Sequence, residues 1–242
     1  MGRAETDKVN LSLIIPVNDE EEIIKGNTIK VVNFLRKSKV IGKFEVLLCD
    51  NGSTDSTLKI AKDLQKQYKE VRALHDDRRG LGIAILLGIK NARYEYLKKQ
   101  DIDLPFGVEI IEKCIKEIGD ADAVIDSKGH KDSMVKRPFT RRVYSKILNM
   151  MLFVLYGINV KDTQGSILFR KSQYMKFIKR LDSPTAFMQT QLVIYAKMNG
   201  LTIKEIPVKY IEEGRSTKMK PLLDGIHIFF EIIKERFKIW FS

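Results

Sequence analysis

The fold is decided by two stretches, Leu11-Ser12-Leu13-Ile14-Ile15-Pro16-Val17 and Val46-Leu47-Leu48-Cys49-Asp50-Asn51-Gly52-Ser53-Thr54-Asp55. Each is a nearly continuous apolar run that ends in a polar turn, which is typical of a strand buried on both faces of a parallel sheet. Between them, one side of a predicted helix carries Ile24, Val31, Val32 and Leu35. The acidic residues 19–22 are expected in its first turn, where they meet the positive end of the helix.

The same alternation continues outward from these stretches. A second helical pattern carries Leu58, Ala61, Leu64 and Tyr68, a third strand covers 71–74, and a further helix runs to Lys90. Alternating strands and helices predict an α/β fold with one doubly wound, mostly parallel sheet flanked by helices. Ligands on such sheets bind beyond the carboxyl ends of the strands. The polar turns after Ile15, Cys49 and Leu74 therefore predict a nucleotide site.

The second half of the chain is less regular. Segments 123–125, 167–169 and 203–210 are predicted strands, and residues 137–157 are first basic and then strongly apolar. The sequence has no repeat and no low-complexity linker, which favours a single domain that extends from residue 1 to residue 220. We expect a nucleotide-binding half at about 9–104, an acceptor half at about 105–220, and a C-terminal amphipathic helix over 221–242.

Composition restricts the class of protein further. The 242 residues carry a net charge of +12, which is typical of proteins that meet nucleic acid, anionic lipid or phosphorylated substrates, although a solvated lysine-rich surface is the simpler alternative. Two cysteines exclude a disulfide framework and indicate a reducing compartment. The longest apolar runs fall short of the ~20 residues that cross a bilayer, and residues 1–10 lack a signal-peptide core. We therefore expect no transmembrane span and no signal peptide.

Two common nucleotide-binding signatures are missing. After Gly80-Leu81-Gly82 the next glycine is Gly88, so the dinucleotide fingerprint fails, and no Gly-Lys-Ser/Thr phosphate loop occurs. Asp50 and Asn51 are instead candidates for binding a base or ribose, although Asn51-Gly52 is also simply a good turn and Ser53 or Thr54 a helix cap. Asp101-Ile102-Asp103 places two carboxylates on the same side of an extended segment, which suits a divalent cation.

These motifs occur in an order that is more specific than any one of them. The ordered set is residues 13–21, 49–55, 80–82 and 101–103, extended by 160–170 (Val-Lys-Asp-Thr-Gln-Gly-Ser-Ile-Leu-Phe-Arg) and 204–208 (Lys-Glu-Ile-Pro-Val). It resembles the family of dolichyl- and polyprenyl-phosphate sugar synthases. The dolichyl-phosphate glucosyltransferase branch is the closer likeness and the mannosyltransferase branch the next. The resemblance covers about Leu11 to Lys220.

The resemblance implies a GT-A fold and inverting transfer of a hexose from a nucleotide-diphosphate sugar to polyprenyl phosphate. It implies that Asp101 and Asp103 hold Mg²⁺ or Mn²⁺, and that Asp103, Asp162 and Gln164 serve catalysis. The residues implied at the nucleotide sugar are Pro16, Val17, Glu20, Asp50, Asn51, Gly80, Gly82 and Asp101. Those implied at the phosphates and the acceptor are Ser127, Lys128, Arg137, Arg141, Arg142, Arg215 and Lys218.

Some positions depart from the pattern of that family. The substituted positions are Asn18, Asp19, Asn51, Pro105, Asp126 and Lys128. In addition, Lys98 and Lys99 stand where an apolar central strand is expected. Because a buried lysine is costly without a partner, these residues predict a shortened strand or an altered metal site.

Two further segments indicate a membrane-bound acceptor. The basic stretch Lys136, Arg137, Arg141, Arg142 and Lys146 is a candidate phosphate clamp, and the apolar run 147–154 after it fits either a bilayer interface or an ordinary core helix. One face of the C-terminal helix carries Ile226, Phe229, Phe230, Ile233, Phe237, Trp240 and Phe241. Aromatic residues opposite cations predict a helix lying in the headgroup layer, and packing on the domain or a partner is the alternative. We expect a peripheral protein on the cytoplasmic face of a membrane.

Three other functions are alternatives to this one. The first is the same chemistry on a soluble saccharide acceptor. The second is a catalytically impaired protein that binds nucleotide sugars, which the lysines before Asp101 favour. The third is a nucleic-acid binder driven by the positive charge; it ranks last because no recognised motif is present.

Overall fold

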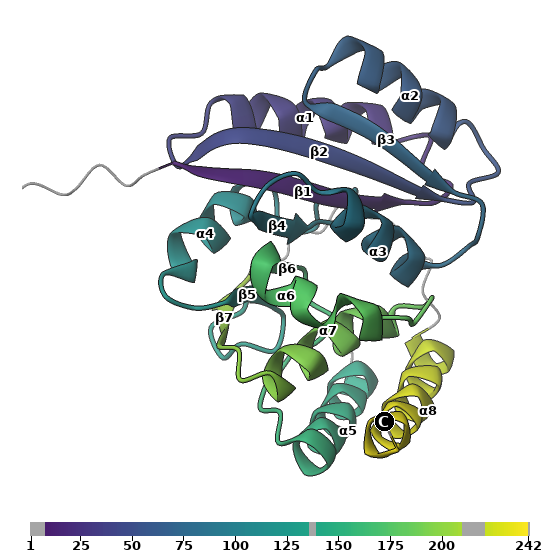
Figure 1. Ribbon diagram of the computed structural model, residues 1–242, viewed down its shortest axis with the longest axis vertical. Coiled ribbons are helices and arrows are strands. Elements are labelled where there is room, and N and C mark those ends of the chain that lie inside the picture. Colours follow the sequence, from purple (N-terminus) through teal and green to yellow (C-terminus); the bar gives the residue numbers. More distant parts are fainter. Residues whose placement is uncertain (1–7, 136–138, 210–220, 242) are drawn as a thin grey trace, which may run out of the picture.

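The computed structural model describes residues 8–135, 139–209 and 221–241, and the side chains of 139–141 and 221–226 lie outside the description. Its centre is a seven-stranded sheet in the order β3-β2-β1-β4-β6-β5-β7 (Figure 1). The strands are β1 (Val9–Val17), β2 (Ile41–Asn51), β3 (Val71–Asp76), β4 (Tyr96–Lys99), β5 (Ala123–Ser127), β6 (Ile167–Arg170) and β7 (Ile203–Pro207). Only β6 runs antiparallel to its neighbours within this sheet, so the mostly parallel α/β prediction is confirmed.

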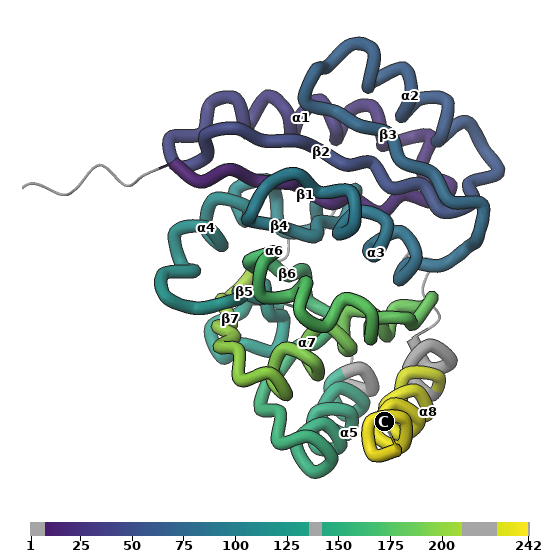
Figure 2. Tube along the Cα trace, in the orientation of Figure 1, coloured from purple at the N-terminus to yellow at the C-terminus, as the bar shows by residue number. Residues whose placement is uncertain are grey.

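Helices cover both faces of the sheet. Their bounds are α1 (Ile24–Arg36), α2 (Thr57–Gln67), α3 (Leu81–Asn91), α4 (Glu109–Ile118), α5 (Phe139–Tyr156), α6 (Lys171–Tyr174), α7 (Phe187–Met198) and α8 (Pro221–Trp240), with a 3₁₀ helix η1 (Met175–Arg180) after α6. One apolar core joins the sheet to α1, α2 and α4. The other joins it to α3, α5, α6, α7 and α8. The chain trace shows the first half, in purple and blue, occupying one side of the molecule and the second half the other (Figure 2).

Two predicted elements differ from the structure in their ends. The last strand stops at Pro207 and does not reach 210; Lys209 forms only an isolated bridge with Met134, and residue 210 lies outside the described residues. The segment 101–103 is a turn and not an extended strand, because β4 ends at Lys99. The two carboxylates of this segment are therefore presented by a loop at the carboxyl end of the sheet.

The lysines predicted to disturb the central strand are accommodated by a buried ion pair. Lys98 and Asp126 are both fully buried, and the lysine Nζ donates to Asp126 Oδ1 at 2.7 Å. Burial is the largest influence on Lys98 and acts to lower its pKa, but the charge of Asp126, its hydrogen bond with Lys98 and the charges of further neighbours together outweigh burial, so the pKa of Lys98 is raised. The departure at residue 126 thus compensates the departure at residue 98. The strand forms, with four residues.

The C-terminal helix α8 has two different apolar faces. Its inner face packs on the domain through buried Ile228, Ile232 and Glu235, whose carboxylate accepts from Tyr195 Oη at 2.5 Å and from Gln191 Nε2 at 2.8 Å on α7. Its outer face exposes Phe230, Phe237, Trp240 and Phe241. Packing on the domain was the alternative that the sequence left open, but the residues of this inner face were not identified there. Packing on the domain therefore accounts for one face of α8 and leaves the other unexplained.

The first turn of α3 depends on a residue without a side chain. The Gly82 amide donates to Pro184 O at 3.0 Å, and a Cβ at Gly82 would lie 2.1 Å from Ser183 O. We expect Gly82→Ala to lower the free energy of unfolding by about 1–3 kcal/mol, because backbone must move to relieve the overlap. Chemical denaturation checks this.

Gly26 in α1 provides the matched control, because nothing lies within 4 Å of a Cβ built there. Gly26→Ala is expected to leave the stability unchanged or to raise it by up to about 1 kcal/mol, since alanine is the better helix former. Equal effects at the two glycines would contradict the close approach at Gly82.

Candidate active site at the strand ends

The loops after β1 and β2 interlock at the carboxyl edge of the sheet. Asp19 Oδ1 accepts from the Thr54 amide at 2.7 Å, the Glu20 amide donates to Thr57 Oγ1 at 2.7 Å, and the Ser56 amide donates to Glu21 Oε2 at 2.9 Å. The acidic residues were predicted in the first turn of α1, and that prediction is wrong: α1 begins at Ile24. The carboxylates of Asp19 and Glu21 instead accept from backbone amides of the opposite loop. This pairing also replaces the predicted caps, because neither Ser53 nor Thr54 caps α2.

Asp50 lies near the end of β2, at this edge. It is fully buried, Oδ2 lies 2.6 Å from His75 Nδ1, and Oδ1 has no hydrogen-bond partner among the described residues. An unpaired buried carboxylate oxygen is costly, so this atom is a candidate acceptor for a ligand N–H or O–H. Neighbouring Asn51 is 4% exposed and its carbonyl accepts from Asn18 Nδ2 at 3.1 Å.

His75 is a site residue that the sequence analysis missed. It lies opposite Asp50 in the β2–β3 register, and its second ring nitrogen, Nε2, is 2.9 Å from Asp77 Oδ1. The available signal was its place at the carboxyl end of the third predicted strand, beside the strand that ends in Asp50. The hydrogen bond with Asp50, followed by that with Asp77, raises the pKa of His75 above its ordinary 6.5.

This raised pKa gives a pH-dependent contribution to stability. A protonated His75 between two carboxylates stabilises the fold fully below pH 6.5, and the contribution is lost as the pH rises through the higher folded-state pKa. We expect the melting temperature of the wild type, relative to His75→Gln, to fall as the pH rises from 6.5 through the higher folded-state pKa of His75. Thermal melts at several pH values check this. A constant difference would contradict a charged imidazole.

The loop after β4 carries Asp101 and Asp103. Asp101 Oδ1 accepts from Lys99 Nζ at 2.5 Å, and Ser166 Oγ donates to Oδ2 at 3.4 Å. Burial is the largest influence on Asp101 and acts to raise its pKa, but Lys99, together with Lys128 and Lys98, outweighs burial and holds the pKa below its usual range. Asp103 remains partly open to solvent, yet its pKa is raised, because the surrounding loops strip water from it and Asp101 is close. The charge of Glu20 acts in the same direction, so the structure brings the loops after β1 and β4 together.

Asp162 and Gln164 lie in a loop that is tied to β5 and α7. The Asp162 carboxylate accepts hydrogen bonds from the backbone N–H of Lys128 at 2.9 Å and from the backbone N–H of Gln164 at 3.3 Å. The Gln164 amide group donates to Thr190 Oγ1 at 2.7 Å and accepts from Gln189 Nε2 at 3.2 Å. Thr190 and Gln189 were not anticipated from the sequence, because a helix as apolar as α7 indicates only core packing. The side chain of Lys128 is close enough for its charge to lower the pKa of Asp101.

The remaining predicted site residues lie in several different surroundings. Val17 is buried in a core and offers only its backbone, and Pro16 is half-buried beside it. Gly80 and Gly82 hold the loop 183–185 against α3, and Ser127 is buried, with Oγ accepting from the Gly129 amide at 3.2 Å. Arg142 is exposed on α5. Arg137, Arg215, Lys218 and the side chain of Arg141 lie outside the described residues.

The carboxylates of the site can be compared with the ligands that a divalent cation requires. No group of three or more histidine, cysteine, aspartate or glutamate side chains in the described part of the chain is arranged to hold a metal. Asp101 is already engaged by Lys99, and Asp103 remains partly open. Two carboxylates fit a Mg²⁺ or Mn²⁺ ion that takes its other oxygen ligands from a diphosphate and water. They do not form a metal site complete in protein ligands.

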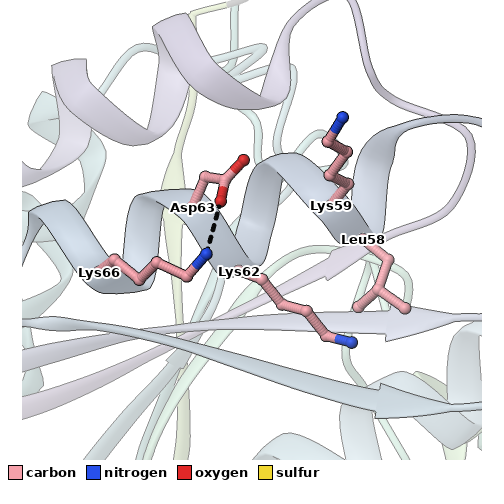
Figure 3. A pocket seen from close by; sticks show the side chains of 5 residues that line it. All are labelled: Leu58, Lys59, Lys62, Asp63 and Lys66. Atoms are coloured by element: carbon pink, nitrogen blue, oxygen red, sulfur yellow. Dashed lines mark hydrogen bonds and ion pairs between the residues drawn. The ribbon is translucent and has the colours of Figure 1, made fainter.

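A concave region lies on α2. It is lined by Leu58, Lys59, Lys62, Asp63 and Lys66, and Lys66 Nζ pairs with Asp63 at 3.0 Å (Figure 3). All five side chains come from one helix. The region therefore brings together no functional side chains from different elements of the fold, and the strand-end loops remain the candidate active site.

Comparison with known proteins agrees with the strand-end geometry. A family model described as glycosyl transferase family 2 matches residues 12–182, which include the three loops that carry Asp50, Asp101 and Asp162. The chain belongs to glycosyl transferase family 2. It is therefore a glycosyltransferase.

Two relatives of this glycosyltransferase are 26% identical to it. One is "Glycosyltransferase AglD" of Haloferax volcanii, over 93% of this chain and 37% of that protein. The other is "Dolichyl-phosphate beta-glucosyltransferase" of Saccharomyces cerevisiae, over 94% of this chain and 74% of that protein. The chain thus spans little more than a third of AglD.

A solved structure shows the same fold. The glucosyl-3-phosphoglycerate synthase of Mycobacterium tuberculosis, in complex with Mn²⁺, uridine diphosphate and glucosyl-3-phosphoglycerate, superposes with a TM-score of 0.70 at 16% identity, over 94% of this chain and 80% of that one. The fold of this glycosyltransferase is accordingly GT-A, as the resemblance implied. Within the described residues, no helix has both the length and the apolar character that crossing a bilayer requires.

Proposed function

We propose that this glycosyltransferase transfers a hexose from a nucleoside-diphosphate sugar to a polyprenyl phosphate with inversion, at a membrane surface. The observation that carries the proposal is the combination of two features in one molecule. Loops bearing Asp50, Asp101, Asp103 and Asp162 meet at the carboxyl edge of the sheet, and α5 and α8 present an exposed apolar surface. The yeast relative named for dolichyl-phosphate glucosylation supports the choice of acceptor.

The donor end of the site follows from the contacts of Asp50 and Asp101. The unpaired Asp50 Oδ1 accepts an N–H from the base, or an O–H from the ribose, while His75 fixes the other oxygen. The diphosphate lies toward the 101–103 turn, where Lys99 and Lys128 offset its negative charge. A divalent cation bound there would act as a Lewis acid that stabilises charge on the departing diphosphate.

The transfer step needs no general base. A phosphate monoester is an anion at neutral pH, since its second pKa is about 6. One of its oxygens attacks the anomeric carbon from the side opposite the diphosphate; the new C–O bond forms as the bond to the diphosphate oxygen breaks, and the electron pair leaves with the nucleoside diphosphate. Asp162 accepts two backbone N–H groups, so its role is to position the sugar or the acceptor together with Gln164.

The surface for the lipid is formed by two helices that lie side by side at one end of the molecule, remote from α2 (Figure 1). Tyr156 Oη on α5 donates to Ile232 O on α8 at 2.7 Å, and the guanidinium of Arg236 lies 5.7 Å from the Tyr156 ring centre. The exposed apolar side chains of this helix pair are Val143, Ile147, Met150, Phe153, Val154, Phe230, Phe237, Trp240 and Phe241. Exposed cations flank them at Arg142, Lys146, Lys234 and Lys238. Aromatic residues beside cations favour a headgroup layer rich in anionic lipid.

Point substitutions test this surface better than truncation, because removing α8 would also remove the buried Ile228, Ile232 and Glu235. We expect the triple variant Phe237→Ser, Trp240→Ser, Phe241→Ser to lose at least about tenfold in its partitioning onto vesicles containing anionic lipid, since three large apolar side chains no longer enter the interface. Vesicle flotation measures it.

Met198→Ser is the control for that measurement, because Met198 is an exposed apolar residue at the end of α7, outside the helix pair. It should float like the wild type. Equal flotation of the triple variant and the wild type would remove α8 from the membrane contact.

A donor screen tests the proposed reaction. Radiolabelled UDP-glucose, UDP-N-acetylglucosamine and GDP-mannose are each incubated with dolichyl phosphate, with and without EDTA, and the lipid phase is extracted. The proposal expects label in the lipid with one donor, in a product of inverted anomeric configuration. Transfer only to a water-soluble acceptor would replace the lipid by a soluble substrate. Nucleotide binding without any transfer would favour the catalytically impaired alternative.

A further inference from the structure

Two adjacent lysines, Lys98 and Lys99, are buried at the end of β4 that leads into the 101–103 turn. Lys98 is 0% exposed and Lys99 is 2% exposed, although lysine is almost never fully buried unless it is paired. Successive residues of a strand face opposite sides of the sheet. Lys98 therefore turns toward α4 and meets Asp126, and Lys99 turns to the other side and meets Asp101. The first lysine is explained by its buried partner. The second ends in the candidate active site.

The carboxylate of Asp101 is occupied by the protein's own donors. Lys99 Nζ lies 2.5 Å from Oδ1, and Ser166 Oγ donates to Oδ2 at 3.4 Å. A divalent cation that took Asp101 as a ligand would have to displace the ammonium or sit beside it, and two cations at that range repel. Within the described residues, the ion pair of Lys99 is with Asp101 and not with Asp103.

The turn brings lysines and carboxylates together. Lys99, Lys128 and Lys98 all act on Asp101, and Lys99 and Glu20 both act on Asp103, so Lys99 lies within electrostatic reach of both carboxylates of the turn. The Asp101 side chain is 43% exposed, so its pair with Lys99 is only half-buried and adds little to stability, because solvent screens the attraction. A role in stability alone thus gives little reason for a lysine at position 99. A permanent positive charge beside a leaving diphosphate does give one.

We propose that Lys99 is a built-in cation of the donor site, which neutralises part of the diphosphate charge and competes with the divalent cation for Asp101. The proposal rests on the proposed function only in placing a nucleoside diphosphate at these loops. It has two measurable consequences. The wild type binds a divalent cation more weakly than the same site would without Lys99, and it binds nucleoside diphosphate appreciably even without metal.

Direct binding measurements test both consequences without a sugar or an acceptor. Mn²⁺ binding in the presence of saturating UDP is followed by electron paramagnetic resonance, and UDP binding in EDTA by calorimetry, with GDP in parallel. The variants are Lys99→Met, Lys99→Gln, and the double variant Lys99→Met, Asp101→Asn. Lys99→Gln removes the charge and keeps a polar side chain that is one atom shorter than lysine, so it serves if the methionine variant does not fold. Thermal melts confirm folding.

We expect both single variants to bind Mn²⁺ about 10-fold tighter or more, because Asp101 is released as a ligand. In EDTA they should bind UDP at least about 10-fold more weakly, since a charge-assisted contact to the diphosphate is lost. The double variant should lose the gain in Mn²⁺ affinity, because the released carboxylate is gone. Lys62→Met, which removes the same charge from the exposed surface of α2 (Figure 3), should change neither quantity.

Either missing change overturns the proposal. Unchanged or weaker Mn²⁺ binding in the single variants would show that Lys99 does not compete for Asp101, and unchanged UDP binding in EDTA would show that it does not meet the diphosphate. Matching shifts in Lys62→Met would assign the effect to net charge and overturn it as well. Failure of the lipid-acceptor proposal is seen separately, as absent transfer to dolichyl phosphate while these binding changes remain. A wild type that binds neither nucleotide would overturn both proposals.

Discussion

Replacing Asp103 by asparagine is expected to lower the rate of sugar transfer by at least about 100-fold. Asp103 is the carboxylate of the 101–103 turn that remains partly open to solvent, whereas Asp101 is bound by Lys99. A cation that arrives with the donor diphosphate would therefore be held on the protein side chiefly by Asp103. The substitution keeps the size of the side chain and removes the charge. Steady-state transfer assays at saturating donor and acceptor measure the effect.

Asp120 is a suitable control for Asp103, because it is an exposed aspartate in the turn between α4 and β5. Asp120→Asn should retain wild-type activity. The binding of Mn²⁺ in the presence of UDP supplies a second readout, and Asp103→Asn should weaken it by about 10–100-fold. Full activity of Asp103→Asn would exclude this carboxylate from the reaction and would leave the site without its most accessible metal ligand.

The largest expected effect on stability comes from Lys98. Lys98→Met should lower the free energy of unfolding by about 3–5 kcal/mol, because it leaves the carboxyl group of Asp126 without its partner in a fully buried place. One oxygen of that carboxylate, Oδ2, already has no hydrogen-bond partner among the described residues, so little remains to compensate the loss. Denaturation in urea measures the difference.

The double variant Lys98→Met, Asp126→Leu tests whether the loss of stability comes from the unpaired Asp126 or from lost packing around residue 98. Replacing both charges by apolar side chains of similar size removes the unpaired carboxylate, so its stability should return to within about 1 kcal/mol of the wild type or exceed it. Lys116→Met is the surface control: it breaks an exposed pair with Glu112 one helical turn away and should cost less than about 0.5 kcal/mol. A double variant as unstable as Lys98→Met would mean that the lysine matters for packing and not for its partner's charge.

The order of strands and helices in the first half of the chain was predictable from local patterns. Continuous apolar runs at 11–15 and 46–49 predict buried strands, and the polar turns after them mark the carboxyl edge of the sheet. Because such edges collect ligands, Asp50 was identifiable as a candidate from its place after the second run, and Asp101 and Asp103 were identifiable from their Asp-x-Asp spacing. The resemblance to a family, which depends on the order of several motifs, added Asp162 and Gln164.

The contacts between residues distant in sequence were not predictable from the same patterns. The carboxylates of 19–22 suit a helix start by local preference, but Asp19 and Glu21 accept from amides of the loop at 54–56, because an interloop hydrogen bond competes with the helix. His75 became a site residue only through its register with Asp50.

The amino-acid order thus determined which elements form and which polar turns gather at one edge, since both depend on the local spacing of apolar and polar residues. Tertiary structure alone decided three other matters: that Lys98 is stabilised by Asp126, that Lys99 holds Asp101, and that α8 has a buried face beside its exposed one. The physical reason is that the cost of burying a charge depends on which side chain lies next to it. In these two ion pairs, the neighbour comes from another strand or from the turn that follows.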